Sequence, residues 1–373
     1  MQLLDALRTQ RLDSSIPGLL DVFSDILNNV QIESNFYITH PEYKPLELPD
    51  EVVARFQQLP LKIQNRYLSL QLRTFLYRIY YNGSYQTTLA ADHNSNGWAV
   101  DEDLENNTVR GLNLEFCQRL CESNRSQGYF DPGWLVVRQE SDGSLAVEKK
   151  GLILHIRPDF HLQPIDRAAT IGSLVAIRMP PNLVQNGFYV AVGNAGRVNP
   201  CHSDGDHQTV NVYFNLSPEG AVAVMKAITE GLNRVKIPFT FKVLYNPSDY
   251  GRYDSGILCF EKANYKTVKP MLKTVYAQHK SHFMQGVPLF TKQLLPGLAL
   301  SEEPDYKFTA KEDFGMNRCQ IVANALLEAW LQGHDSPEGR MNFILHNFSL
   351  LGIDIKRPYL NANSKDIYSA TRK

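Results

Sequence analysis

The hydrophobic positions change their period along the chain, from a helical spacing to an alternating one. Between residues 50 and 83 the apolar residues recur three or four positions apart, and Gly83 ends the pattern: Leu68, Leu72, Phe75, Leu76 and Ile79. This spacing predicts a helix with one buried face. We therefore expect residues 1 to about 110 to be mostly helical, with a boundary or long loop in the polar, turn-rich stretch 91–111. The segment LNLEFCQRLCESN that follows reads as a short amphipathic helix.

From residue 128 the pattern alternates, and turn residues separate short apolar runs. GYFDPGWLVV begins a series of strands that continues through SLVAIRMPPNLVQNGFYVAVG, which predicts a small antiparallel sheet. A strand in QTVNVYFNL precedes a helix with Ser217 as its N-cap and Pro218 as its first residue. Strands in IPFTFKVLY and SGILCFE follow, then helices over about 265–283 and about 315–332. The polar tail after about residue 355 is expected to be loosely ordered.

These elements predict an α+β protein with a helical N-terminal region and a mixed, largely antiparallel sheet domain with packed helices. The expected divisions are a helical region over 1–110, the α+β domain over 111–335, and a C-terminal extension over 336–373.

Composition and charge exclude several classes of protein. The chain has 373 residues, of which 43% are hydrophobic, enough for a sizeable core. Its 38 basic and 39 acidic residues argue against a chain-wide surface for nucleic acid or acidic membrane. The first residues do not form a secretory signal, and no run reaches the ~18 apolar residues of a membrane helix. Five scattered cysteines are typical of reduced thiols, which predicts a cytoplasmic protein.

Most familiar motifs are missing. The sequence contains no GxxxxGK[ST], no GxGxxG between a strand and a helix, and no GxSxG. Cys117 and Cys121 lie four residues apart, which favours packing on one helix face over metal binding. In CHSDGDH, the residues His202, Asp204 and His207 form a candidate metal set, although a solvated loop is the favoured interpretation.

Cations inside strand-like segments are the better candidates for chemistry. In FTFKVLY the aromatic residues alternate onto one face, which puts Lys242 on the other. Arg252, Lys292 and Arg318 follow in later segments. A group of cations on one sheet face suits a phosphate or carboxylate. The alternative is internal ion pairing of Lys242 or Arg252 with Asp254 or Glu261.

An ordered series of motifs resembles the HopA-type effector family, named for a type III secreted protein of a plant pathogen. The resemblance covers about residues 115–330 and includes these segments: GYFDPGWLVV, GLILHIRP, NGFYVAVGNAG, VYFNLSPEGAVAVM, LNRVKIPFTFKVLYNPSDYGRYDSGILCF, GVPLFTKQLLPGLALSEEP and FGMNRCQIVANALLEAW. Related domains act as lyases in class V lanthipeptide biosynthesis.

The resemblance implies a metal-free and cofactor-free lyase that eliminates phosphate from phosphoserine or phosphothreonine in a peptide, leaving a dehydroamino acid. By position, Lys242 would be the base, and Tyr213 or Tyr253 would protonate or orient the leaving group. Phosphate would be held by Arg252, Lys292, Arg318 and Asn211, with Asp254 orienting Arg252. Gly315 would let the backbone approach the anion or allow a tight helix start.

The implied partners are a phosphorylated peptide, a separate kinase and a cyclase, with no nucleic acid or membrane. An effector role after secretion follows from the resemblance alone.

Two positions depart from the family pattern. Asn211 stands where an arginine is expected, and Asn317 stands where a histidine often precedes the arginine of RC. A phosphate contact and a proton donor would then be missing. The alternative function is a non-catalytic module that binds a peptide or a partner protein.

Overall fold

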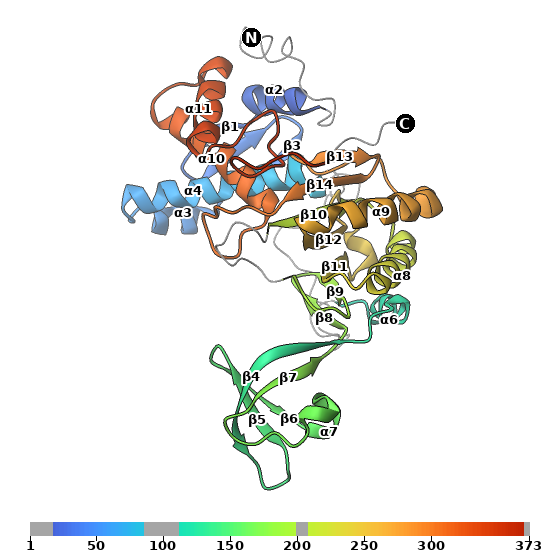
Figure 1. Ribbon diagram of the computed structural model, residues 1–373. Coiled ribbons are helices and arrows are strands. Elements are labelled where there is room, and N and C mark those ends of the chain that lie inside the picture. The colour runs from blue at the N-terminus through green and yellow to red at the C-terminus, as the bar shows by residue number, and fades with distance from the viewer. Residues whose placement is uncertain (1–17, 86–111, 199–207, 369–373) are drawn as a thin grey trace.

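A seven-stranded antiparallel sheet forms the centre of the protein. The computed structural model describes residues 18–85, 112–198 and 208–368 (Figure 1). The strands follow the order β13-β14-β10-β12-β11-β9-β8, and each neighbouring pair is antiparallel. Their bounds are β13 Lys292–Leu295, β14 Leu298–Glu302, β10 Thr209–Phe214, β12 Gly256–Glu261, β11 Phe239–Leu244, β9 Phe188–Val192 and β8 Asn182–Gln185. The predicted α+β class is confirmed.

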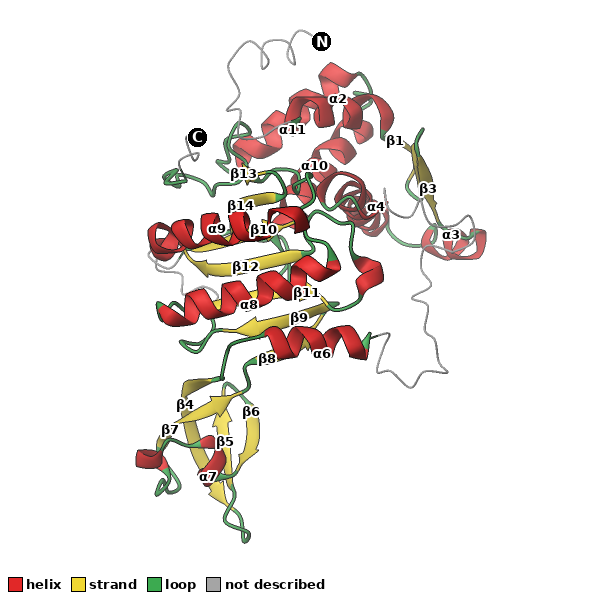
Figure 2. Ribbon diagram, turned by 90° about the vertical axis from the view of Figure 1, so that its right-hand side faces the viewer, coloured by secondary structure: helices red, strands yellow, loops and turns green. Residues whose placement is uncertain are grey.

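Helices cover one face of this sheet (Figure 2). They are α6 Leu114–Ser123, α8 Pro218–Arg234 and α9 Tyr265–His279. As expected, Ser217 caps α8 by accepting a hydrogen bond from the Gly220 amide at 3.1 Å. Alternate residues of the strands, among them Phe239, Phe241 and Phe260, point towards these helices and are fully buried.

A second core lies across the other face at the β13–β14 end of the sheet. It joins α2 Leu19–Asn29, α4 Leu61–Leu76, α10 Phe314–Leu331 and α11 Pro337–Leu350. A π-helical turn, η1 Tyr77–Tyr81, ends α4 just before Gly83, whose φ of 70° favours glycine. The sequence pattern did not reveal α11. It also did not reveal three short strands before α3 Asp50–Phe56: β1 Gln31–Ser34, β2 Tyr37–His40 and β3 Tyr43–Glu47.

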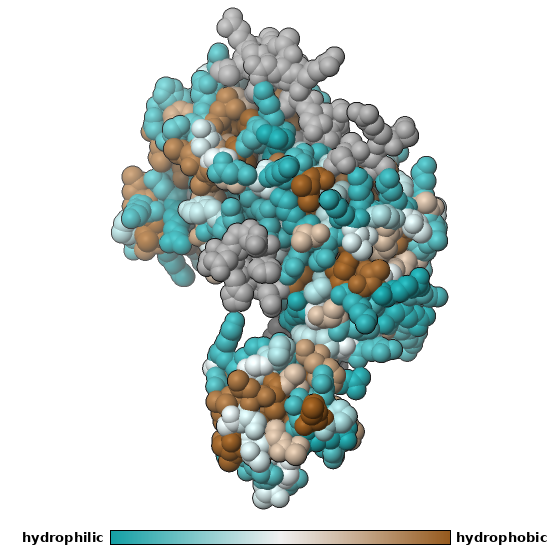
Figure 3. All heavy atoms as spheres, viewed as in Figure 1, coloured by the Kyte–Doolittle hydropathy of each residue, from teal (hydrophilic) through white to brown (hydrophobic). Residues whose placement is uncertain are grey.

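A four-stranded sheet projects from the main body (Figure 1). It consists of β4 Tyr129–Gln139, β5 Leu145–Lys149, β6 Leu152–Ile156 and β7 Leu174–Met179, with the short helix α7 Pro158–His161. The small antiparallel sheet was therefore predicted, but not its extent, because β8 and β9 pair with the large sheet. Apolar side chains gather on its surface (Figure 3), including Leu152, Phe160, Ile165 and Leu174.

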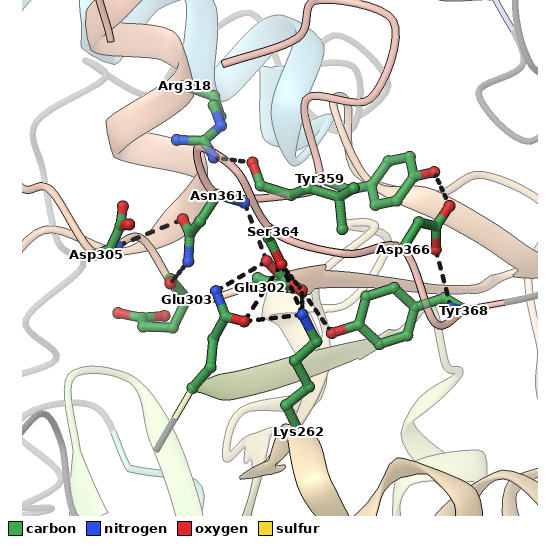
Figure 4. Close-up of polar contacts among 12 residues, drawn as sticks. Lys262, Glu302, Glu303, Asp305, Arg318, Tyr359, Asn361, Ser364, Asp366 and Tyr368 are labelled. Carbon is green, nitrogen blue, oxygen red and sulfur yellow. Dashed lines mark hydrogen bonds and ion pairs between the residues drawn. The ribbon is translucent and has the colours of Figure 1, made fainter. Parts of the chain in front are cut away.

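The C-terminal segment 354–368 is packed against the sheet, so the prediction of a loose tail is wrong for these residues. Tyr359 and Tyr368 have no exposed surface. Glu302 of β14 is equally buried and accepts hydrogen bonds from the Asn361 amide, Ser364 and Tyr368 at 2.9–3.0 Å, and it pairs with Lys262 (Figure 4). A buried carboxylate with this many donors is tolerated.

Within residues 18–85, 112–198 and 208–368, no helix is both long and apolar enough to cross a bilayer.

The fold predicts that the helix-covered face of the large sheet carries the stability. Phe241→Ala removes a fully buried ring between sheet and helices, and we expect it to lower the free energy of unfolding by about 3–5 kcal/mol. The matched variant Phe160→Ala, at a ring that is 61% exposed, should change it by less than about 1 kcal/mol. Urea unfolding monitored by circular dichroism gives both values. Equal losses would contradict this assignment of the core.

Candidate functional site

The face of the large sheet opposite helices α6, α8 and α9 forms the floor of a cavity of about 1060 Å³. Strand register aligns Val190, Lys242, Ile257 and Tyr213 side by side across four strands. The next row contains Thr240, Cys259 and Asn211. The walls come from η1, the β8–β9 turn, the β11–β12 loop and the segment 303–316 that leads into α10.

Lys242 lies on the cavity floor. The burial of β11 alternates, and Lys242 is half-exposed between the buried Phe241 and Val243, which confirms the predicted facing. No hydrogen bond or ion pair joins the Lys242 side chain to any residue within the described ranges. The sequence-based alternative of an internal ion pair therefore does not apply to Lys242 there.

Arg252 and Asp254 form the internal pair that the sequence left open. The Nε and Nη2 atoms of Arg252 donate to the two carboxylate oxygens of Asp254 at 2.7 and 2.8 Å. Asp254 is 2% exposed, whereas the Arg252 side chain keeps 23% of its surface accessible. Burial opposes the charge of Arg252, but the contact with Asp254 outweighs it and raises the pKa of the guanidinium. Arg252 thus presents a fixed positive charge to the cavity.

A second carboxylate, Asp313, lies on the other side of Tyr77. The Tyr77 hydroxyl is 3.3 Å from Oδ2 of Asp254 and 3.4 Å from Oδ2 of Asp313. Asp313 also caps α10, where its Oδ1 accepts the Met316 amide at 2.8 Å. Although it opens to the cavity, desolvation by the surrounding walls raises its pKa to about 6, helped by Asp254 and Glu303. No sequence motif marked Asp313 or Tyr77 as a site residue.

The charges that line the cavity are balanced. Five cations, Arg78, Lys242, Arg252, Lys307 and Lys311, stand against five carboxylates, Asp249, Asp254, Glu303, Glu312 and Asp313, among the described residues. Arg78 stacks on the ring of Tyr85 with its guanidinium 4.3 Å from the ring centre. Glu303 binds Lys307 and accepts Asn211 Nδ2 at 2.7 Å. The cavity therefore lacks the strong positive excess that the sequence suggested.

Lys292 and Arg318 lie outside this cavity. Lys292 is 4% exposed and donates to Asp366 at 2.9 Å and to the Tyr359 hydroxyl at 3.1 Å. Arg318 is 1% exposed and binds the carbonyl oxygens of Pro358 and Leu360 at 2.8 and 3.0 Å. Both cations anchor the C-terminal segment.

Of the two predicted tyrosines, Tyr213 lies in the cavity and Tyr253 does not, while Gly315 packs against Tyr81 in the cavity wall. Tyr213 lines the cavity, is 3% exposed and lies 3.1 Å from the Ser301 hydroxyl, and burial raises the pKa of its phenol. Tyr253 instead lines a separate hollow, where its ring packs on Gly83 and Gly286. A Cβ on Gly315 would approach the Tyr81 ring to 2.3 Å, so this glycine makes room for a cavity wall.

The predicted metal ligands His202, Asp204 and His207 lie outside the described residues. Within the ranges that the structure describes, no group of three His, Cys, Asp or Glu side chains is arranged to hold a metal ion. Burial raises the pKa of the Cys259 thiol on the cavity floor to about 12, so this thiol stays protonated and is a poor nucleophile.

The part of the chain that contains the cavity floor is similar to a known family. Residues 179–360 match the HopA1 effector protein family. An effector protein from Pseudomonas syringae pv. syringae strain 61 aligns with 15% identity over 67% of this chain and 81% of its own, with a TM-score of 0.39. One from P. syringae pv. tomato strain DC3000 aligns with 14% identity over the same shares, with a TM-score of 0.40. No curated protein matches.

The position of Arg318 predicts a structural effect rather than a loss of anion binding. Arg318→Leu removes the partner of two buried carbonyl groups, and we expect it to lower the free energy of unfolding by about 2–4 kcal/mol. Arg234→Leu, at a side chain 74% exposed on α8, is the matched control and should be nearly neutral. Chemical unfolding measures both. A folded Arg318→Leu protein of unchanged stability would refute the anchoring role.

Proposed function

We propose that the protein, whose residues 179–360 match the HopA1 effector protein family, is a metal-free lyase for phosphorylated peptides. It eliminates phosphate from phosphoserine or phosphothreonine and leaves a dehydroamino acid. The observation that carries this proposal is the amine of Lys242, which lies on the cavity floor without a partner among the described residues.

Elimination needs a positioned base, because the Cα proton of a peptide residue is very weakly acidic. A lysine that an internal carboxylate does not hold can turn its amine towards a substrate and, in its neutral form, accept this proton. The charge that develops on the adjacent carbonyl requires nearby positive groups. Arg252 is held rigidly by Asp254 and Arg78 is held by its stacking on Tyr85, so both suit this task.

The leaving phosphate carries close to two negative charges. In the cavity it meets Arg252, Arg78 and Lys311. Arg78 and Lys311 take the places predicted for Lys292 and Arg318, which lie outside the cavity. Since the cations are matched by carboxylates, the directions in which the N–H groups of the cavity point select the phosphate more than the net charge does. A kinase must supply the phosphorylated peptide, and a cyclase could use the dehydro product in lanthipeptide-type maturation. The family is also consistent with a role after secretion.

A non-catalytic phosphopeptide-binding module is the second candidate. It is favoured because the side chains at the two positions that depart from the family pattern are hydrogen-bonded to other groups of the protein. Asn211 donates to Glu303, and Asn317 is buried and donates to the Tyr306 carbonyl and to Glu312. The amide groups of both side chains are thus engaged within the protein.

The proposal predicts turnover that depends on Lys242 and on no metal. Synthetic phosphoserine and phosphothreonine peptides are incubated with the protein and EDTA, and their masses are measured. We expect loss of phosphoric acid, about 10²-fold slower or more in Lys242→Ala. Lys242→Arg keeps the charge but not the base and should be equally slow, whereas Lys226→Ala, at an exposed position on α8, should match the wild type.

The alternatives give different masses. Loss of the phosphoryl group alone would indicate hydrolysis and reject the lyase. Binding without any change of mass, measured by fluorescence anisotropy of the same peptides, would favour the binding module.

A further inference from the structure

The hydroxyl of Tyr77 lies between two carboxyl groups that compete for its single hydrogen. The phenol oxygen lies within hydrogen-bond distance of two carboxylate oxygens, Oδ2 of Asp254 and Oδ2 of Asp313. An ionised carboxylate only accepts, and a tyrosine has one hydrogen to donate. Sharing this hydrogen between both oxygens gives only a long three-centre bond, whereas a proton on one of the two carboxyl groups makes each contact a hydrogen bond of its own.

Asp313 is the member of this pair that holds the proton. Asp254 receives two charge-assisted hydrogen bonds from Arg252, which stabilise its ionised form. Asp313 forms no such pair with a cation in the described part of the chain; its contacts are the Met316 amide at Oδ1 and Tyr77 at Oδ2. The consistent arrangement is Tyr77 donating to Asp254 while Oδ2 of Asp313 donates to Tyr77.

The groups that face Asp313 from the neighbouring elements support this assignment. Asp254 and Glu303 are negative and disfavour a third carboxylate, whereas Lys242 on β11 opposes them and Met316 donates from α10. Tyr77, Tyr81, Tyr213 and Cys319 add neutral groups, because burial raises the pKa of each. These groups and the thiol of Cys259 hold their protons too tightly to give them up near neutral pH. No histidine occurs among the described residues that line the cavity.

We propose that Asp313 donates a proton to the leaving phosphate and that Tyr77 positions Asp313; this inference rests on the proposed elimination. Lys242 Nζ takes the Cα proton, and the electron pair left behind forms the Cα–Cβ double bond. The Cβ–O bond breaks with its electrons on the phosphate oxygen, and Oδ2 of Asp313 gives that oxygen a proton. The products are the dehydro residue and hydrogen phosphate. Lys242 is then cationic and Asp313 ionised, and exchange with water restores both.

Substrate binding itself favours the protonated donor. A phosphate dianion beside Asp313 adds negative charge and further disfavours the carboxylate. One of the five carboxylates that line the cavity is then neutral while the phosphate is bound.

The first test detects the proton directly and needs no turnover. Full-length protein labelled with carbon-13 at aspartate carboxyl groups is titrated by NMR, and the signal missing in Asp313→Asn is assigned to Asp313. We expect this signal to titrate near pH 6, and at lower pH in Tyr77→Phe, which lacks the acceptor. A carboxyl that is already ionised at pH 5 would overturn the inference, even in an active enzyme.

The second test separates proton donation from structural support. Peptides with phosphoserine or with O-sulfoserine are compared, because sulfate leaves as a stable anion that needs no proton. We expect Asp313→Asn to slow phosphate elimination by about 10²-fold or more and sulfate elimination by only a few fold. Asp159→Asn, at an exposed position on α7, should slow neither. Equal losses on both substrates would overturn the role of Asp313 as donor.

The two proposals fail separately. If the wild type converts neither peptide, the elimination is rejected, and the carboxyl titration still decides whether Asp313 keeps its proton up to about pH 6. If turnover occurs and phosphate elimination by Asp313→Asn is normal, the lyase stands and Asp313 is excluded.

Discussion

The alternation of side chains across the large sheet is the constraint from which the site follows. One face of each strand must be apolar because α8 and α9 bury it, so the residues between those positions are forced onto the opposite face. Lys242 is on the cavity floor because Phe241 and Val243 are in the core. A shift of one residue in β11 would exchange them, burying the charge and exposing the rings.

The ion pairs and hydrogen bonds of the four candidate cations divide them into two groups with different tasks. Lys292 and Arg318 are saturated by the C-terminal segment, and their contacts stabilise the packing of that segment. Arg252 has one carboxylate partner and still reaches the cavity, and Lys242 has none in the described residues. The number and type of partners, more than the presence of a cation, therefore separates the candidate site from the scaffold.

Short-range patterns predicted the elements well, while contacts distant in sequence escaped prediction. The N-cap at Ser217, the facing of Lys242 and the order of strands and helices from β10 to α9 depend on neighbouring residues, and each is confirmed. Lys292 and Arg318 appeared to be site residues because their partners, from 358 to 366, lie 40 to 74 positions away. Tyr77 and Asp313 were missed for the same reason, since 236 residues separate them.

The C-terminal segment has a consequence for the order in which the chain can fold during synthesis. Glu302, Lys292 and Arg318 are made before the residues that satisfy them, Pro358 to Tyr368. Until those residues leave the ribosome, this edge of the sheet must keep its charges hydrated, because burying them alone is costly. Strands β9 to β12 and helix α8 face no such delay. The sheet can therefore assemble from its centre while the β13–β14 edge waits for residues 358–368.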